Sequence, residues 1–257
     1  MALENKFQLT NFNPEILREY DIRGVVGQNL NENTAYSIGR TFGHIVASNF
    51  NNKKVAVGYD GRLTSPKLHS ALCNGLVESG INVYSIGLCP TPMSYFSNYH
   101  LETDASVMVT GSHNPSEYNG FKMVLDKNSF YAENIQKLQS LTKLKLIKSK
   151  GTFTAVDIKK DYVSRNLKNI NLKKKLKIAW DIGNGAVGSV IDEFIKRLDN
   201  AEHILINEKV DGNFPNHHPD PTVPANMEQL IKTVNLNSCD IGIAFDGDGD
   251  RLGVVDN

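Results

Sequence analysis

Three aspartates separated by single glycines carry the clearest chemical signal in this chain of 257 residues. After an apolar run, the segment reads Phe245-Asp246-Gly247-Asp248-Gly249-Asp250-Arg251. Crowded carboxylates repel one another unless a cation neutralises them, and glycines let the backbone curl so that alternate side chains converge. Carboxylate oxygens are hard ligands that favour Mg²⁺ or Ca²⁺. We therefore expect Asp246, Asp248 and Asp250 to bind one divalent ion, with water or a phosphate oxygen completing its shell.

Two other interpretations of this aspartate loop are an EF-hand calcium loop and a solvated acidic turn. An EF-hand needs glycine at its sixth position and glutamate at its twelfth, where this chain has Arg251 and Asn257. The flanking segments also look like strands rather than helices, which argues against an EF-hand. A solvated turn would leave the concentration of carboxylates unexplained.

A second candidate is the serine loop, Thr110-Gly111-Ser112-His113-Asn114-Pro115, which follows the strand-like residues 106–109. Loops at the carboxyl ends of such strands are where open α/β sheets usually bind ligands. A serine hydroxyl can accept and return a phosphoryl group, which splits one difficult transfer into two easier ones. The alternative is a polar turn whose Ser112 and Asn114 only satisfy backbone groups. A serine-hydrolase elbow is disfavoured because Asn114 stands where Gly-x-Ser-x-Gly requires glycine.

Alternating strand-like and helix-like segments predict an α/β fold that must position these two loops. Helices are expected over residues 33–50, 65–80, 132–144, 187–198 and 225–234, and strands over 54–57, 82–86, 105–109, 121–125, 177–180, 203–206 and 240–245. Ser65 is the expected N-cap of the second helix, with Pro66 at its first position. A Lys-rich stretch closing at Gly151 predicts a domain boundary, giving domain I over residues 1–155 and domain II over 156–257.

Composition excludes several partners. Lys plus Arg and Asp plus Glu both total 28, so no net field would attract nucleic acid or an anionic membrane. No apolar run approaches the ~20 residues that span a bilayer. The first residues, Met1 to Lys6, have no apolar signal segment. Three cysteines without metal-ligand spacing favour reduced thiols in a cytoplasmic protein.

Two further motifs suggest other functions. Gly183-Asn184-Gly185-Ala186-Val187-Gly188 matches G-x-G-x-x-G between a strand and a helix, so an NAD-dependent oxidoreductase is a rival interpretation. That interpretation leaves both the serine loop and the aspartate loop unexplained. His217, His218 and Asp220 could suggest another metal site, but the neighbouring Pro-Asp-Pro turn favours a structural loop.

Five motifs in order give the chain a family resemblance that covers almost its whole length. They are Glu19-Tyr20-Asp21-Ile22-Arg23-Gly24, then Val57-Gly58-Tyr59-Asp60-Gly61-Arg62, then the serine loop with Tyr118-Asn119-Gly120-Phe121-Lys122, then residues 211–221, and finally the aspartate loop. With these motifs the chain resembles the α-D-phosphohexomutases, most closely the bacterial phosphomannomutase/phosphoglucomutase branch. The resemblance implies two consecutive α/β domains with mixed sheets sandwiched by helices, the first half of a four-domain architecture.

The resemblance also implies roles for individual residues. Ser112 would be a phosphoserine whose phosphate binds Mg²⁺ beside the three aspartates, so Ser112 counts among the metal ligands. His113 and Lys122 match positions for acid–base or electrostatic work, and Arg23 and Arg251 match positive residues lining the same site. The implied reaction interconverts hexose 1-phosphate and 6-phosphate, with mannose or glucose phosphate as substrate, through a 1,6-bisphosphate intermediate.

The chain departs from the family pattern in its length. Domains III and IV, which would carry a Gly-Glu-Met-Ser-Gly-His sugar-reading loop and a loop for the non-reacting phosphate, are not found in these 257 residues. We therefore expect little mutase turnover from this chain alone. A separate C-terminal half is one possible partner, and a non-catalytic fragment or interaction module is the remaining alternative.

Overall fold

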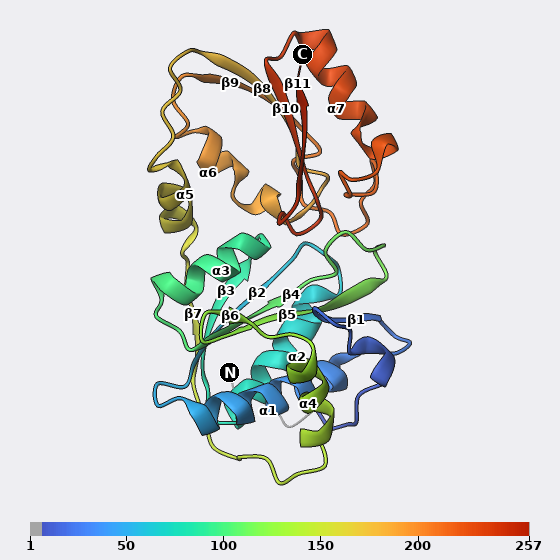
Figure 1. Ribbon diagram of the computed structural model, residues 1–257, viewed down its shortest axis with the longest axis vertical. Coiled ribbons are helices and arrows are strands. Elements are labelled where there is room, and N and C mark those ends of the chain that lie inside the picture. The colour runs from blue at the N-terminus through green and yellow to red at the C-terminus, as the bar shows by residue number, and fades with distance from the viewer. Residues whose placement is uncertain (1–6, 257) are drawn as a thin grey trace.

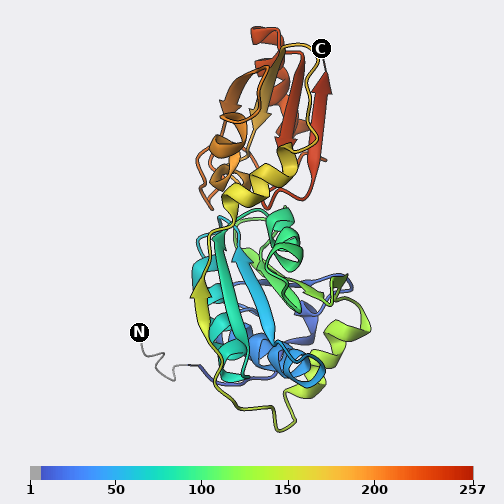
Figure 2. The same cartoon turned by 90° about the vertical axis from the view of Figure 1, so that its left-hand side faces the viewer.

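The computed structural model describes residues 7–256 of the chain as two α/β domains stacked along the long axis (Figures 1 and 2). Residues 1–6, on which the expectation of no signal segment rests, and Asn257, used in the EF-hand comparison, lie outside the described residues. No helix within the described part is long and apolar enough to cross a membrane.

The first domain is built on a mixed sheet of seven strands in the order β1-β5-β4-β2-β3-β7, with β6 pairing with β5. Strands β4, β2, β3 and β7 run parallel, whereas β5 is antiparallel to both β4 and β1. The strands are β1 Ile22–Val25, β2 Lys54–Tyr59, β3 Asn82–Leu88, β4 Ala105–Val109, β5 Tyr118–Leu125, β6 Asn128–Ser129 and β7 Phe153–Ala155.

Helices cover both faces of this sheet, as the sequence predicts. On one face lie α1 Glu32–Asn49, α2 Ser65–Glu78 and α4 Glu133–Leu141, and on the other lies α3 Thr91–His100 (Figure 1). A short 3-10 helix, Pro14–Ile16, precedes β1. The prediction of Ser65 as N-cap is wrong by one residue, because Thr64 holds that position and the Ser65 hydroxyl instead donates to Asp60 Oδ1 at 2.5 Å.

The second domain has a mixed four-stranded sheet in the order β11-β10-β8-β9, in which only β11 is antiparallel to its neighbour. Its strands are β8 Leu176–Asp181, β9 Ala201–Ile206, β10 Ile241–Phe245 and β11 Leu252–Asp256. Helix α7, Pro224–Asn237, packs on one face and α6, Ile191–Ile195, on the other. Helix α5, Lys159–Leu167, follows β7 where the chain passes between the domains (Figure 2).

The helix expected over residues 187–198 is interrupted. It consists of a 3-10 helix, Ala186–Ser189, followed by the short α6. At Gly188 a β-carbon would lie 2.3 Å from the carbonyl oxygen of Glu208, so the backbones touch there. Close backbone contact replaces the regular helical turn that the apolar spacing predicts.

Candidate active site

The serine loop leaves the carboxyl end of β4, in the middle of the first sheet. Ser112 is 2% exposed and has a φ of 50°, in the left-handed region that residues with a β-carbon rarely adopt. Its amide donates to Thr110 Oγ1 at 2.8 Å, which helps hold this conformation. The surrounding structure therefore fixes the direction of the Ser112 hydroxyl.

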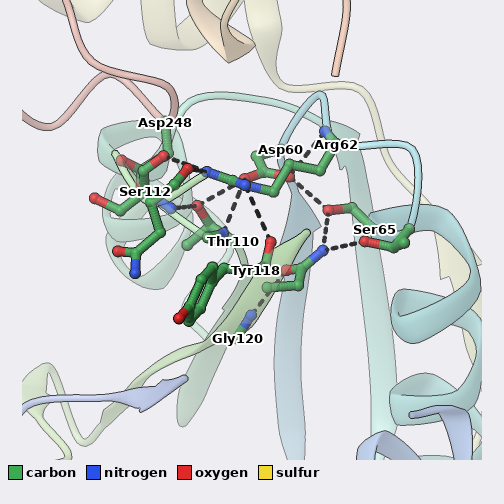
Figure 3. Close-up of polar contacts among 12 residues, drawn as sticks. Asp60, Arg62, Ser65, Thr110, Ser112, Tyr118, Gly120 and Asp248 are labelled. Carbon is green, nitrogen blue, oxygen red and sulfur yellow. Dashed lines mark hydrogen bonds and ion pairs between the residues drawn. The ribbon is translucent and has the colours of Figure 1, made fainter. Parts of the chain in front are cut away.

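An ion pair just after the neighbouring strand β2 lies beside this loop (Figure 3). The carboxylate of Asp60 accepts hydrogen bonds from the Thr110 hydroxyl at 2.8 Å and the Gly111 amide at 3.1 Å. Arg62, only 1% exposed, lies against the same carboxylate, with 3.2 Å between Nε and Oδ2. Asp60 and Arg62 belong to one of the five sequence motifs, but neither was among the expected site residues. The available signal was its place at the end of the strand next to the serine strand.

The aspartate loop connects β10 to β11, so its flanks are strands, as expected. Asp246 and Asp248 are fully buried, while Asp250 is partly exposed. One carboxylate oxygen from each of the three lies within 4.8 Å of the other two. Asp248 Oδ2 accepts from the Thr91 hydroxyl at 2.5 Å, and its buried Oδ1 has no hydrogen-bond partner among residues 7–256. Sequence reasoning missed Thr91, because the prolines on both sides of it concealed helix α3.

The structure brings these two loops into contact across the domain junction. Ser112 Oγ donates to Asp246 Oδ2 at 3.2 Å, although the residues are 134 positions apart. A β-carbon on Gly247 would lie 2.5 Å from the Ser112 carbonyl oxygen, so the two backbones also touch. Lys122, on β5, donates from Nζ to Asp248 Oδ2 at 2.7 Å and to Asp250 Oδ2 at 2.5 Å.

Burial and crowding set the charges of the aspartates. Burial, reinforced by the charge of Asp248, raises the pKa of Asp246 to about 7. Burial also opposes ionisation of Asp248, but its ion pair with Lys122 outweighs burial and lowers the pKa of Asp248. The same pair raises the pKa of Lys122 against the effect of its own burial. Lys122 therefore neutralises only part of the negative charge of the three carboxylates.

The other three expected site residues lie around Ser112. His113 Nδ1 is 3.1 Å from Ser112 Oγ, and burial, followed by the positive charges of Arg251 and Arg23, lowers its pKa. Arg23 donates to the Gly111 carbonyl at 2.7 Å and forms an ion pair with Asp21, while its buried Nε has no partner in the described residues. Arg251 lines the pocket in front of the serine, although its side chain makes no hydrogen bond within the described residues.

The pocket in front of Ser112 has a volume of about 620 Å³. Three cations and three aromatic rings line it beside two aspartates, Asp21 and Asp250, and the cations and rings suit an anionic ligand with a ring. The lining includes Arg23, Lys122, Arg251, Tyr20, Tyr95 and Tyr131. The three tyrosines were not among the expected site residues.

The glycine-rich turn at residues 183–188 supports the aspartate loop rather than offering free donors to a nucleotide. Its Ala186 amide donates to the Gly247 carbonyl at 2.9 Å, and a β-carbon on Gly185 would lie 2.8 Å from the same oxygen. The amides of Gly183, Asn184 and Gly185 are also bonded within the protein. A pyrophosphate would have to displace these bonds, which disfavours the NAD interpretation.

His217 is not part of the acidic cluster. Its Nε2 lies 2.8 Å from the buried Asp181 Oδ2, and this bond raises the pKa of His217. The Asp181 carboxylate also accepts from the Asn207 side chain at 2.9 Å. This arrangement fits the structural loop that the sequence favours.

The residues present fit a hard divalent cation. Three carboxylates converge, a buried Asp248 oxygen lacks a partner among residues 7–256, and the Ser112 hydroxyl borders the cluster. All of these donors are oxygens, the type that Mg²⁺ prefers.

The chain is therefore a two-domain α/β protein in which a buried serine hydroxyl lies against a cluster of acidic oxygens. Family comparisons specify it further. The chain matches the model of phosphoglucomutase/phosphomannomutase alpha/beta/alpha domain I over residues 14–145 and that of domain II over residues 160–257. The chain therefore belongs to the phosphoglucomutase/phosphomannomutase family, which confirms the family and fold predictions.

Curated relatives agree with this assignment. A phosphomannomutase/phosphoglucomutase of Pseudomonas putida is 48% identical over 245 residues, which cover 94% of this chain and 52% of that protein. A phosphoglucomutase of Neisseria gonorrhoeae is 42% identical over 244 residues, covering 94% and 53%. The chain thus spans about half the length of the curated relatives it matches.

Solved structures show the same relationship. A phosphoglucomutase/phosphomannomutase family protein from Burkholderia thailandensis superposes with a TM-score of 0.90 at 40% identity, covering 95% of this chain and 55% of that one. The phosphoglucomutase parafusin from Paramecium has a TM-score of 0.78 at 18% identity, covering 97% and 54%. The Paramecium protein shares the fold, and the Burkholderia protein supports the family assignment as well.

Proposed function

We propose that this chain forms the phosphoryl-transfer half of a phosphohexomutase active site, with Ser112 as the group that carries the phosphoryl. The observation that carries the proposal is the 3.2 Å contact between Ser112 Oγ and Asp246 Oδ2 across two domains. A polar turn that only satisfied its own backbone would not need to meet a buried acidic cluster. Membership in the phosphoglucomutase/phosphomannomutase family supports the reaction class.

The proposed reaction moves one phosphoryl group in each direction. A hydroxyl oxygen of a hexose monophosphate attacks the phosphorus of phospho-Ser112 and loses its proton to a nearby base, while the P–O bond to the serine breaks and the leaving Ser112 Oγ takes up a proton. The product is a hexose 1,6-bisphosphate. After the bisphosphate turns around, Ser112 Oγ gives up its proton and attacks the other phosphorus, the P–O bond between that phosphorus and the sugar breaks, and the released sugar oxygen takes up a proton. Ser112 thereby recovers a phosphoryl group, which completes the interconversion of 1-phosphate and 6-phosphate.

We propose Mg²⁺ as the cofactor, held by Asp246, Asp248 and Asp250 together with a phosphate oxygen on Ser112. When bound, the ion neutralises negative charge on the phosphoryl oxygens during transfer. The aspartates hold the ion, and the Lys122 ammonium beside Asp248 supplies a second positive charge at the same place.

Four basic residues are proposed to act on the transferring group. Lys122 and His113 are proposed for acid–base or electrostatic work. The 3.1 Å between His113 Nδ1 and Ser112 Oγ and the bond from Lys122 Nζ to Asp248 support this proposal. Arg23 and Arg251 line the pocket and can bind phosphate oxygens through planar guanidinium groups. Positioning and cations around the phosphoryl oxygens supply most of the catalysis in such transfers.

Hexose phosphates, with mannose and glucose phosphates first, are the proposed substrates, and the cytoplasm is the proposed location. We propose domain limits of 1–155 and 156–257, with the serine loop on the first domain and the aspartate loop on the second. The rest of a family enzyme would orient the far end of the substrate, whether it continues this chain or is a separate C-terminal half.

Peptide mapping with intact mass tests the proposal directly. After incubation with glucose 1,6-bisphosphate and Mg²⁺, one phosphoryl group should be found on Ser112, and Ser112→Ala should take up none. Wild-type chain without phosphate on Ser112 under these conditions would contradict the proposal and favour a non-catalytic interaction module.

A further inference from the structure

We infer that Arg62 is a positioning residue for phosphoryl transfer: it holds the Ser112 backbone in its working conformation and in register with the second domain. The inference rests on the function proposed for Ser112. Arg62 makes no hydrogen bond to the Ser112 hydroxyl or to the carboxylates of Asp246, Asp248 and Asp250, so it would act only through the loop it holds.

The guanidinium of Arg62 forms hydrogen bonds with the backbone of the serine loop and of the residues that follow it (Figure 3). It donates to four carbonyl oxygens within seven consecutive residues, and its Nε lies against Asp60. The four bonds reach Ser112 O at 2.8 Å, Asn114 O at 2.6 Å, Pro115 O at 2.6 Å and Tyr118 O at 3.0 Å. Because four carbonyls of one loop converge on a single buried cation, the contact fixes the loop's shape.

The Ser112 carbonyl is the central contact. It accepts from Arg62 Nη2 on one side, and on the other it touches Gly247, where a β-carbon would come within 2.5 Å. Ser112 also has the unfavourable φ of 50°. A residue in this region persists only when its surroundings over-determine it, and the bond from Arg62 supplies a large part of that restraint.

The other face of the Arg62 guanidinium packs against the second domain. The Phe214 ring lies over its guanidinium, with 5.3 Å between Cζ and the ring centroid. Beside it, β-carbons on Gly61 and Gly212 would come within 2.4 Å of Val210 and 2.7 Å of the Gly61 carbonyl, so these loops pack without a gap. Arg62 is therefore enclosed by the serine loop on one side and by domain II on the other.

Only arginine suits this position. Its planar group presents five donors in a rigid fork and stacks on aromatic rings, whereas a lysine ammonium is compact and has three donors. A lysine at position 62 could keep the charge next to Asp60, but it could not reach four carbonyls at once. Replacement by lysine should therefore preserve the fold better than it preserves the position of Ser112.

The test compares Arg62→Ala and Arg62→Lys with the wild-type chain and with Arg165→Lys, a control at an exposed arginine. Two quantities are measured on each protein: the rate at which glucose 1,6-bisphosphate phosphorylates Ser112, and the affinity of the unphosphorylated chain for Mn²⁺. Misplacing a reacting group by about 1 Å costs on the order of 100-fold in rate. We expect Arg62→Ala to lose about this much and Arg62→Lys at least about tenfold, while Mn²⁺ affinity stays within about twofold because the aspartates are untouched.

Chemical rescue gives a readout that a merely structural role would not produce. Methylguanidinium at millimolar concentration should restore much of the phosphorylation rate of Arg62→Ala, but not that of Arg62→Lys, whose side chain still fills the site. The planar cation can occupy the space that alanine leaves between the carbonyls and Phe214.

Three results would overturn the inference. Phosphorylation of Arg62→Lys at the wild-type rate would show that the fork is dispensable. A parallel loss of Mn²⁺ affinity and rate in both variants would show a general fold defect. Failure of the wild-type chain itself to be phosphorylated would instead refute the proposed function, and with it the basis of this inference.

Discussion

At the residue scale, the site is a balance between crowded carboxylates and one ammonium. Asp248 is ionised despite complete burial because Lys122 lies 2.7 Å away, while Asp246 has a pKa raised to about 7 by burial and by its neighbour's charge. Lys122 and a divalent cation would both be attracted to the same oxygens. Removing the Lys122 ammonium should therefore change the metal affinity and the phosphorylation rate in opposite directions.

We predict that Lys122→Met strengthens Mg²⁺ binding several-fold and slows phosphorylation of Ser112 by about 100-fold. Removing the ammonium frees Asp248 and Asp250 for the metal ion, but it also removes a cation from the transferring group, and one such donor is worth about 10²–10³ in rate. Calorimetry gives the affinity and phosphate uptake gives the rate. A variant that lost both together would show that Lys122 chiefly stabilises the loop.

The residues of the two loops could be found from the sequence because each loop brings several polar residues and glycines together in one short segment after a strand. Arg62 and Thr91 could not be found in that way. The partners of Arg62 are backbone carbonyl oxygens, which every residue has, so no residue type marks them in the sequence. Two of these partners, in Ser112 and Tyr118, are 50 and 56 residues away. Local patterns carry no information about such contacts.

At the element scale, close packing of α1 on α2 supports the sheet that carries the serine loop. Gly39 and Gly75 make this contact, since a β-carbon on either would lie 2.2 Å from a backbone carbonyl of the other helix. The helices predicted from apolar periodicity agree well with α1 and α2. Helices α3 and α5 were missed because proline-flanked and charged segments lack the periodicity.

We predict that Gly75→Ala destabilises the fold by about 1–3 kcal/mol, the usual cost of overpacking. At an open position within a helix, the same change would gain about 0.5–1 kcal/mol. Urea denaturation measures the difference, and Ser48→Ala on the exposed face of α1 should change stability by less than about 0.5 kcal/mol. A stabilised Gly75→Ala variant would mean that the helices separate at little cost.

His69 on α2 makes the stability of the first domain depend on pH. Burial lowers its pKa to about 4, only partly offset by a hydrogen bond with the Val57 backbone. The unfolded chain binds a proton at this ring near pH 6.5 and the folded chain does not until about pH 4, so stability is lost as pH falls through this window.

We predict that the unfolding free energy falls about 2 kcal/mol more between pH 7 and pH 5 in the wild type than in His69→Gln. Urea titrations at several pH values measure this difference, and His100→Gln at the surface serves as the control. Parallel pH profiles for the wild type and His69→Gln would show that water reaches the His69 ring in the folded state.

At the scale of the whole molecule, the site exists because the carboxyl edges of two sheets face each other. Strands β2 and β4 end in the Arg62 and Ser112 loops, and β8 and β10 end in the glycine-rich turn and the aspartate loop. The sequence predicts both domains and the loop at each edge. Their approach could be expected only from the family resemblance, because no periodicity specifies how two domains dock.

We predict that Ser112 of the 257-residue chain is phosphorylated by glucose 1,6-bisphosphate. We expect the chain to isomerise mannose or glucose phosphate at least about 100-fold more slowly than it is phosphorylated. Binding energy at the far end of a substrate helps to orient it for productive transfer, and the cations of the described pocket, Arg23, Lys122 and Arg251, lie around Ser112. A coupled assay measures isomerisation. Robust turnover would show that residues 7–256 bind both ends of the substrate.

The central claim, that Ser112 and the three aspartates share one divalent ion, is tested most directly by ³¹P electron–nuclear double resonance on the phosphorylated chain loaded with Mn²⁺. We predict a resolved coupling between bound Mn²⁺ and a single phosphorus on Ser112, with metal affinity lowered at least about tenfold in Asp248→Asn and unchanged in the surface variant Asp199→Asn. Mn²⁺ bound at the aspartates without any coupling to that phosphorus would contradict it.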